Sequence, residues 1–340
     1  MKTFGFRHAT RVEDAIHAVA DTGGKFLAGG TNLIDLMKRG VEAPPALVDI
    51  GRLNLTTISP TRTGGVLIDA GATNSAIANH SLIRTQYPVL SQAILSGATT
   101  QLRNMATAGG NLLQRTRCPY FMETAFAACN KRTPGTGCAA RHGFNRERAI
   151  FGASDRCVAI HPSDMAVALA ILDASVHVQG PSGARSIPIS DFFRLPADTP
   201  ETDNTLLPAE LILGLELPPS GFGAHSWYLK VRDRHSYAFA LVSVAVGLRI
   251  DHDAIGAAAI ALGGVAAKPW RVREAEDSLI GKRPSPTAFH TAAERALSGA
   301  EALSQNGFKV DLGRHSVVRA LTLATDNRRA DNRDAALHCQ

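Results

Sequence analysis

The chain has 340 residues, 45% of them hydrophobic and 19% charged, a composition typical of a soluble globular protein with room for two domains. Its net charge of +6 is compatible with nucleic-acid binding, but aromatic residues make up only 6% and no nucleic-acid-binding motif occurs. The N-terminal sequence has no apolar signal segment, and no apolar run is long enough to span a membrane. We therefore expect no membrane insertion and no nucleic-acid partner.

The first third of the chain mixes short helices and strands. Thr10 and Glu13 form a capping-box pattern ahead of apolar residues at helical spacing, and Thr73 or Asn74 is suited to cap a later helix. The predicted elements of this part are helices at 11–20, 33–37, 75–80 and 87–95, and strands at 25–28, 47–50 and 66–70.

From residue 115 to 156 the apolar periodicity is lost, and Pro, Gly and Cys become frequent. Regular structure resumes at Ser163, a good N-cap, and a linker is predicted at 217–226. The later predictions are a helix at 164–173, a polar loop at 196–208, strands at 175–179, 211–217, 227–232, 238–250 and 257–264, two further helices, and a frayed tail. Because helices and strands do not alternate as βαβ units, the pattern favours an α+β fold.

Two glycine-rich turns, Ala28–Asn32 and Thr107–Asn111, each precede residues with helical spacing. Paired glycines allow close approach of the backbone to a ligand and can direct N–H groups at phosphate oxygens. Two such turns favour a shared pyrophosphate, and hence a dinucleotide such as FAD. The stretch at 135–140 formally matches G-x-G-x-x-A, but it follows no strand and is set aside.

Four cysteines, Cys118, Cys129, Cys138 and Cys157, lie in the irregular segment. No C-x-x-C pair occurs, which excludes zinc-ribbon and thioredoxin signatures. Free buried thiols, two disulfides, a zinc ion or a 4Fe–4S cluster all remain compatible with the spacing. An excess of Arg and Lys in the segment suits an anionic cluster. Cys339 lies in the tail and is not assigned a role.

Two charged residues have both a structural and a functional interpretation. Asp164 can stabilise a helix N-terminus by its charge, or accept a hydrogen bond from a ribityl or ribose hydroxyl. Lys230 fits a solvated strand end or a ligand contact. No catalytic triad, nucleophile elbow or zinc helix is found, and we predict no catalytic residue in this chain.

Four segments taken together resemble a known family: FLAGGTNLIDLMK (26–38), QLRNMATAGGNLLQRTRCPY (101–120), HPSDMAVAL (161–169) and KVRDRHSYAFALVSVA (230–245). They are similar to the FAD-binding subunits of molybdenum hydroxylases, the xanthine oxidase family, and within it to those of bacterial periplasmic aldehyde oxidoreductases. The resemblance covers roughly residues 1–325. It implies a vanillyl-alcohol-oxidase-type (PCMH) FAD domain at 1–221, a smaller α+β CO-dehydrogenase-flavoprotein-like domain at 222–325 and a tail at 326–340.

The resemblance also implies site residues. The expected FAD contacts are Phe26, Leu27, Ala28, Gly29, Gly30, Thr31, Asn32, Leu33, Gly97, Thr107, Ala108, Gly109, Gly110, Asn111, Asp164, Ile212 and Lys230. In the aldehyde oxidoreductase branch, the cysteine-rich insertion at about 115–158 carries a 4Fe–4S cluster, which here implies the ligands Cys118, Cys129, Cys138 and Cys157.

We therefore expect an electron-transfer subunit of a heterotrimer. A large partner with molybdenum cofactor would oxidise an aldehyde to a carboxylic acid, and a small partner with 2Fe–2S clusters would pass electrons to FAD, which delivers them to an external acceptor. The alternatives are a stand-alone flavin oxidase of the vanillyl-alcohol type and a basic nucleic-acid-binding or scaffold protein. The expected compartment is the periplasm, reached by co-export with a signal-bearing partner, or else the cytoplasm.

Overall fold

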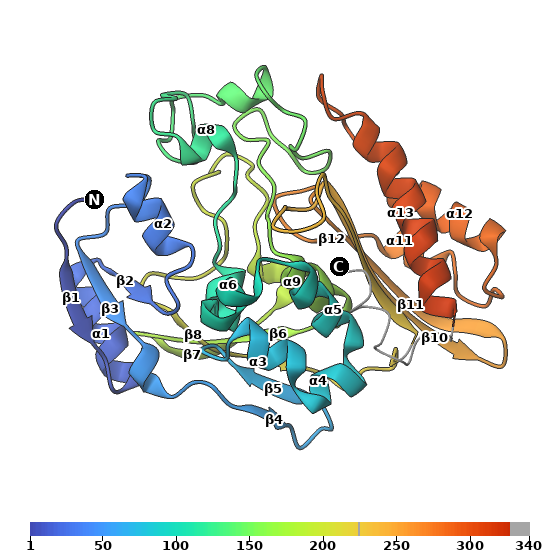
Figure 1. The fold of residues 1–340 in the computed structure, drawn as a ribbon, viewed down its shortest axis with the longest axis horizontal. Coiled ribbons are helices and arrows are strands. Elements are labelled where there is room, and N and C mark those ends of the chain that lie inside the picture. The colour runs from blue at the N-terminus through green and yellow to red at the C-terminus, as the bar shows by residue number, and fades with distance from the viewer. Residues whose placement is uncertain (224, 327–340) are drawn as a thin grey trace.

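The structure is a computed structural model that describes residues 1–223 and 225–326. Three sheets carry the described part of the fold (Figure 1), with strand orders β1-β3-β2, β4-β5-β8-β6-β7 and β12-β11-β10-β9. The first sheet is parallel, and the other two are antiparallel. The strands are β1 (Gly5–His8), β2 (Lys25–Leu27), β3 (Ala46–Asp49), β4 (Ile58–Pro60), β5 (Val66–Asp69), β6 (Ser175–Gly180), β7 (Gly183–Pro188), β8 (Leu211–Leu217), β9 (Ser226–Val231), β10 (Val242–Asp251), β11 (Ala254–Gly263) and β12 (Trp270–Arg271).

The helices cover these sheets. They are α1 (Val12–Thr22), α2 (Leu33–Lys38), α3 (Asn74–Asn79), α4 (Ser81–Gln86), α5 (Pro88–Ser96), α6 (Thr100–Met105), α7 (Ala108–Leu112), α8 (Pro119–Met122), α9 (Asp164–Ile171), α10 (Ile189–Phe192), α11 (Arg273–Asp277), α12 (Pro286–Ala296) and α13 (Phe308–Thr325). In Figure 1, α1 and α2 lie beside the three-stranded parallel sheet, and α3 to α6 lie beside the five-stranded sheet. Helices α11 to α13 cover one face of the four-stranded sheet. Among the described residues, every helix is too short or too polar to span a bilayer.

Helix α9 joins the two halves of the molecule. All of Met165 to Ile171 is buried, and the helix packs against α5 on one side and against β10 and β11 on the other. A helix that is apolar on every face is stable only when it is surrounded by protein. Ser163 caps it as predicted, since its Oγ accepts a hydrogen bond from Ala166 N at 3.0 Å. The first residue of α9, Asp164, is thereby fixed at the end of a rigid element.

The C-terminal sheet is buried on both faces along β10. Residues Val242 to Leu248 are fully enclosed, with α13 on one face and α9 on the other. The strand begins at Val242 and not at 238 as predicted, because the preceding residues form a loop in which Tyr237 has φ +51°. Three helices follow the sheet where two were expected.

The predicted α+β class is confirmed: a larger N-terminal part with two sheets is followed by a smaller C-terminal part with one sheet. The linker predicted at 217–226 connects β8 to β9. The division at residue 221 stays a prediction, and the proposed tail beyond 326, with Cys339, lies outside the described residues.

Several local predictions were wrong or incomplete. Thr10 does not cap α1: Arg11 is the N-cap and makes no side-chain capping bond, so the capping box does not form. Thr73, not Asn74, caps α3 by accepting from Ala76 N. The elements that the pattern missed are short or lie at edges, namely β1, β4, β7, β12, α4, α6, α8 and α10.

Candidate functional site

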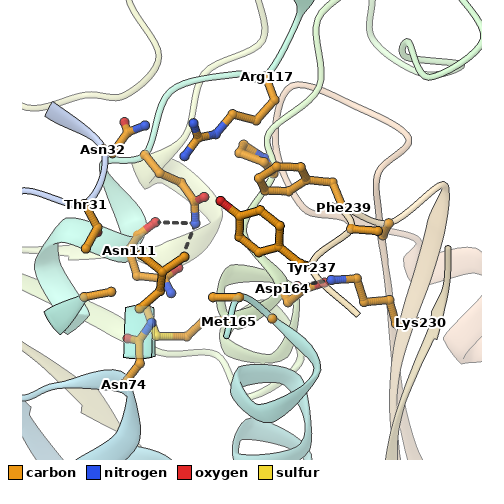
Figure 2. A pocket seen from close by; sticks show the side chains of 18 of the residues that line it. Thr31, Asn32, Asn74, Asn111, Arg117, Asp164, Met165, Lys230, Tyr237 and Phe239 are labelled. Atoms are coloured by element: carbon orange, nitrogen blue, oxygen red, sulfur yellow. Dashed lines mark hydrogen bonds and ion pairs between the residues drawn. The ribbon is translucent and has the colours of Figure 1, made fainter. Parts of the chain in front are cut away.

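A cavity of about 740 Å³ lies where the first glycine turn, α7, α9 and the loop before β10 converge (Figure 2). Its wall combines small residues, polar side chains and two aromatic rings, those of Tyr237 and Phe239. Ligand pockets for cofactors are typically concave, of this size, and mostly apolar with a few convergent polar groups. The cavity is therefore the candidate site.

The two glycine turns meet at this cavity. A Cβ built on Gly29 would lie 1.8 Å from the backbone oxygen of Met105, two residues before the second turn, so only glycine permits the approach. The backbone N–H of Arg115, just beyond the second turn, donates to Asn32 Oδ1 at 2.9 Å. The sequence prediction that both turns border one site is thus consistent with the geometry.

The second turn contributes its shape and side chains. Its backbone N–H groups are already engaged: Ala108 and Gly109 donate to Ala72 O and Ala70 O, and Gly110 donates to the Thr107 hydroxyl. The expectation that this turn directs its N–H groups at a phosphate is therefore not met, because α7 is docked on the end of β5. Asn111 is held beside it by Ser163 Oγ, which donates to Asn111 Oδ1 at 2.6 Å.

Asp164 and Lys230 form a buried pair on the cavity wall. Lys230 Nζ donates to Asp164 Oδ2 at 2.8 Å, and the Tyr228 hydroxyl donates to Asp164 Oδ1 at 2.6 Å. The Lys230 side chain is only 4% exposed, which excludes the solvated-strand-end interpretation. Burial and the nearby carboxylate raise the pKa of Tyr228 well above its usual value, so this hydroxyl keeps its proton.

Some of the residues predicted to contact FAD line the cavity, and others lie outside its lining. The predicted residues that line the cavity are Thr31, Asn32, Gly97, Gly110, Asn111, Asp164 and Lys230. Those that do not line it are Phe26, Leu27, Ala28, Gly29, Gly30, Leu33, Thr107, Ala108, Gly109 and Ile212. Most of this second set shapes the turns, and Ile212 packs behind Gly109, 3.7 Å from the position of a Cβ there.

Buried polar atoms without hydrogen-bond partners gather around the same cavity. Within the described residues, Asn32 Nδ2, Asn74 Oδ1, Arg117 Nε and Arg148 Nε are buried and unpartnered, and all four residues line it. Unsatisfied buried polar groups are unfavourable, by about 1–3 kcal/mol each. Their concentration here fits a polar ligand that completes these bonds.

Comparison with known proteins decides the family. Residues 2–220 match the FAD-binding domain in molybdopterin dehydrogenase, and residues 227–324 match the CO dehydrogenase flavoprotein C-terminal domain. The chain belongs to this family of FAD-binding subunits of molybdenum hydroxylases.

Individual relatives agree with that assignment. The chain is 47% identical to the aldehyde oxidoreductase FAD-binding subunit PaoB of Escherichia coli over 95% of this chain and 99% of the relative. It is 29% identical to the glyceraldehyde dehydrogenase medium chain of Sulfolobus acidocaldarius, over 80% and 79% of the two chains. A CO dehydrogenase structure from Oligotropha carboxidovorans shares the fold, with a TM-score of 0.73 at 23% identity, over 95% of this chain and 98% of that one.

This FAD-binding subunit has cavity residues that sequence reasoning missed. They are Asn74, Arg117, Arg148, Met165, Arg234, Tyr237 and Phe239, among others. Arg117 stands one residue before a predicted cluster ligand, and its guanidinium lies over the ring of Phe239 at 5.4 Å. Only its closeness to the second turn in the sequence could have indicated it.

The cysteines of the insertion converge in one small core. Cys118, Cys129 and Cys157 are buried together with Phe121 and Met122, and Cys138 packs against them. All four thiols are free, which excludes the two-disulfide alternative in this structure. Within the described residues, no group of three or more His, Cys, Asp or Glu side chains is arranged to hold a metal ion. The donor set nevertheless has the chemistry that iron–sulfur clusters require.

Asn130 ties three of the cysteine-bearing segments together. It follows Cys129, its Oδ1 accepts from Gly137 N at 2.8 Å, and its Nδ2 donates to Arg156 O at 3.0 Å. Gly137 and Arg156 are the residues that precede Cys138 and Cys157. This one buried amide therefore sets the spacing of three thiols.

Burial raises the pKa of Cys129, and it raises that of Cys157 to about 11. Both thiols are thus protonated at neutral pH, and coordination to iron would release those protons.

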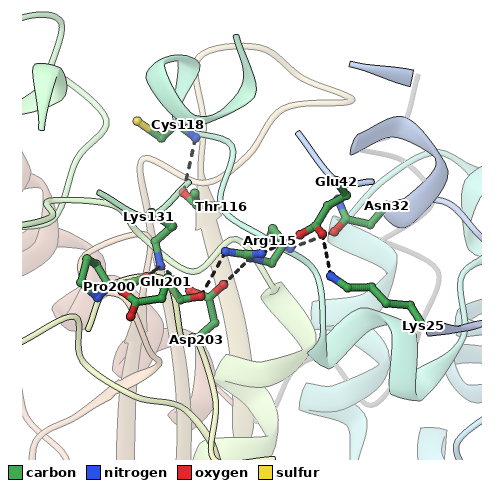
Figure 3. Close-up of polar contacts among 10 residues, drawn as sticks. All are labelled: Lys25, Asn32, Glu42, Arg115, Thr116, Cys118, Lys131, Pro200, Glu201 and Asp203. Carbon is green, nitrogen blue, oxygen red and sulfur yellow. Dashed lines mark hydrogen bonds and ion pairs between the residues drawn. The ribbon is translucent and has the colours of Figure 1, made fainter. Parts of the chain in front are cut away.

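Several basic residues of the insertion are paired with carboxylates from elsewhere in the chain, among them Arg115 and Lys131 (Figure 3). Arg115 bridges Glu42 at 2.7 Å and Asp203 at 2.5 Å, and the buried Lys131 also pairs with Asp203. Part of the positive excess that the sequence suggested for an anionic cluster is therefore neutralised by these carboxylates. Its visible role is to anchor the insertion to the loop at 196–208 and to the segment after α2.

We expect the imidazole of His161, whose Nε2 is buried without a hydrogen-bond partner among the described residues, to make this subunit sensitive to acid. Burial lowers its pKa from 6.5 to about 4. Below pH 6.5, His161 binds a proton in the unfolded chain but stays neutral in the folded chain. The free energy of unfolding therefore falls as the pH drops from 6.5 toward 4. The free energy of unfolding should decrease by about 3 kcal/mol from this group. Urea unfolding at pH 7 and pH 4 measures it; an equal decrease in His161→Leu would show that other groups cause it.

Proposed function

We propose that the chain is the FAD- and 4Fe–4S-containing electron-transfer subunit of a heterotrimeric, molybdenum-dependent aldehyde oxidoreductase. A large partner with molybdenum cofactor would convert aldehyde to carboxylic acid, and a small partner with 2Fe–2S clusters would supply electrons to this chain. The observation that carries the proposal is the near full-length similarity to the aldehyde oxidoreductase subunit, at 47% identity. FAD, when bound, exchanges electrons singly or in pairs and so connects one-electron clusters to an external acceptor.

The residues of the chain bind and orient the cofactor in this proposal. The first turn, closed on Met105 through Gly29, and the second turn form the floor for the dinucleotide. Asp164 is held by Lys230 and Tyr228, so both of its carboxylate oxygens are fixed in position. Such a pre-set acceptor suits a cofactor hydroxyl without further reorganisation.

We also propose Cys118, Cys129, Cys138 and Cys157 as the ligands of a 4Fe–4S cluster. Support comes from four free thiols in one core and from the organising bonds of Asn130. Arg117, which lines the cavity, directly precedes Cys118, so the cysteine core adjoins the FAD site. The cluster would also give the irregular segment an ordered centre.

Purification of the full chain alone and with its two partners tests these roles. Absorption and EPR spectra should report flavin and a 4Fe–4S signal in the chain, with aldehyde turnover only in the complex. Turnover of an alcohol or aldehyde by the lone chain would favour the stand-alone oxidase instead. We propose a periplasmic location by co-export with a signal-bearing partner; fractionation of cells that carry all three subunits tests it, and recovery in the cytoplasm would overturn it.

A further inference from the structure

Arg148 is a buried cation on the wall of the FAD cavity, supplied by the cysteine-rich insertion. The residue is 1% exposed and lines the cavity. Its Nε has no hydrogen-bond partner among the described residues. Nη2 lies 3.3 Å from an oxygen of Glu147, whose side chain is 43% exposed. The guanidinium is therefore desolvated and only weakly compensated.

The C-terminal domain fixes the backbone of this residue. Arg148 O accepts from Lys309 Nζ at 3.0 Å and from Asn306 Nδ2 at 3.2 Å. Lys309 is itself fully buried and also donates to Gly264 O at 2.5 Å. Burial, and then the charge of Arg148, lower the pKa of Lys309 to about 7. The buried amino group of Lys309 thus lies directly behind Arg148, which lines the cavity wall.

A buried charge without a full partner is strongly unfavourable. A ligand that supplies the missing acceptor removes this unfavourable free energy, and its binding is stronger as a result. FAD offers such acceptors in its pyrophosphate and in the carbonyl groups of its isoalloxazine ring. We propose that Arg148 is a direct FAD-binding residue that donates to one of these groups. The proposal rests on the FAD role of the chain and adds a contact from the insertion to those of the two glycine turns.

The test compares Arg148→Met with the unchanged full chain after removal of the flavin. Because one charge-assisted contact is lost, FAD affinity should fall by about 10- to 100-fold. The melting temperature of the flavin-free protein should stay the same or rise, since an uncompensated buried cation has been removed. A merely structural arginine would do the reverse and lower the melting temperature. Arg148→Lys should retain part of the affinity.

Arg156→Met is the matched control. It removes the same charge from the same insertion, but Arg156 forms a surface ion pair with Asp198 and does not line the cavity. Its FAD affinity should be unchanged. Riboflavin titrations locate the contact: a parallel loss of riboflavin affinity in Arg148→Met places it at the ring, and an unaffected riboflavin affinity places it at the pyrophosphate.

Unchanged FAD affinity in Arg148→Met would overturn the proposal, as would a loss of affinity that comes with a less stable flavin-free protein. Both outcomes are distinct from failure of the proposed function. That failure would show as absence of FAD binding by the unchanged chain, or as substrate turnover without partners.

Discussion

Replacing Gly29 by alanine should strip most of the FAD from the protein. The new Cβ would lie 1.8 Å from Met105 O and 2.7 Å from Met105 C, so it collides with backbone and not with a side chain that could rotate away. The first turn would have to move off the segment before the second turn, which opens the floor of the site. Forced displacements of this kind take about 1–3 kcal/mol, so FAD affinity should fall by about 10- to 100-fold.

Flavin content after purification and titration with added FAD measure the loss. Gly5→Ala is the control, because Gly5 lies in β1 of the sheet whose strand β2 leads into the first turn, and its Cβ would meet Ala46 Cβ at 3.6 Å and Pro45 O at 3.8 Å, both ordinary contacts. Full FAD occupancy in Gly29→Ala would contradict the account of the turns.

Replacing Cys157 by serine should remove the iron–sulfur cluster. Cys157 is buried in the cysteine core, and a serine hydroxyl of similar size does not ionise at neutral pH and is a poor iron ligand. We expect loss of nearly all iron and acid-labile sulfide and of the low-temperature EPR signal, with FAD retained in part. Iron and sulfide analysis of the anaerobically purified complex measures it.

Cys339→Ser serves as control, since that residue is outside the proposed ligand set. Asn130→Ala should give an intermediate result. It keeps all four thiols but removes the amide that connects the segments of three of them, so the cluster should be present at lower occupancy. Unchanged iron in Cys157→Ser, with the protein folded by circular dichroism, would refute the ligand assignment.

Features set by neighbouring residues were accessible from the sequence. Ser163 caps α9 because its hydroxyl reaches the N–H of Ala166, three residues on. The glycine turns could likewise be recognised, since close backbone approach requires residues without a Cβ. The residue types at Asp164 and Lys230 allowed a functional role, and the family resemblance assigned both to the FAD site. Their pairing links residues far apart in the chain.

Features set by tertiary packing were not accessible. The capping-box pattern at Thr10 and Glu13 predicted a helix that begins at residue 11. The helix begins one residue later, with Arg11 as the N-cap, and the capping box does not form. Tyr237, directly before the strand predicted at 238–250, has a positive φ that no local sequence signal requires, and the strand begins only at Val242. In the sequence, Arg148 is not distinguishable from the other basic residues of the insertion. Only the fold shows that it is buried next to α13 and lines the cavity. The acid partners of Arg115 and Lys131 likewise come from other segments.

The most direct test of the central claim is rapid, anaerobic mixing of aldehyde with the protein while flavin absorbance is followed. We expect the flavin of the complete complex to be reduced, and the flavin of this chain alone to stay oxidised until the partners are added. Reduction of the isolated chain by aldehyde at the same rate as the complex would contradict it.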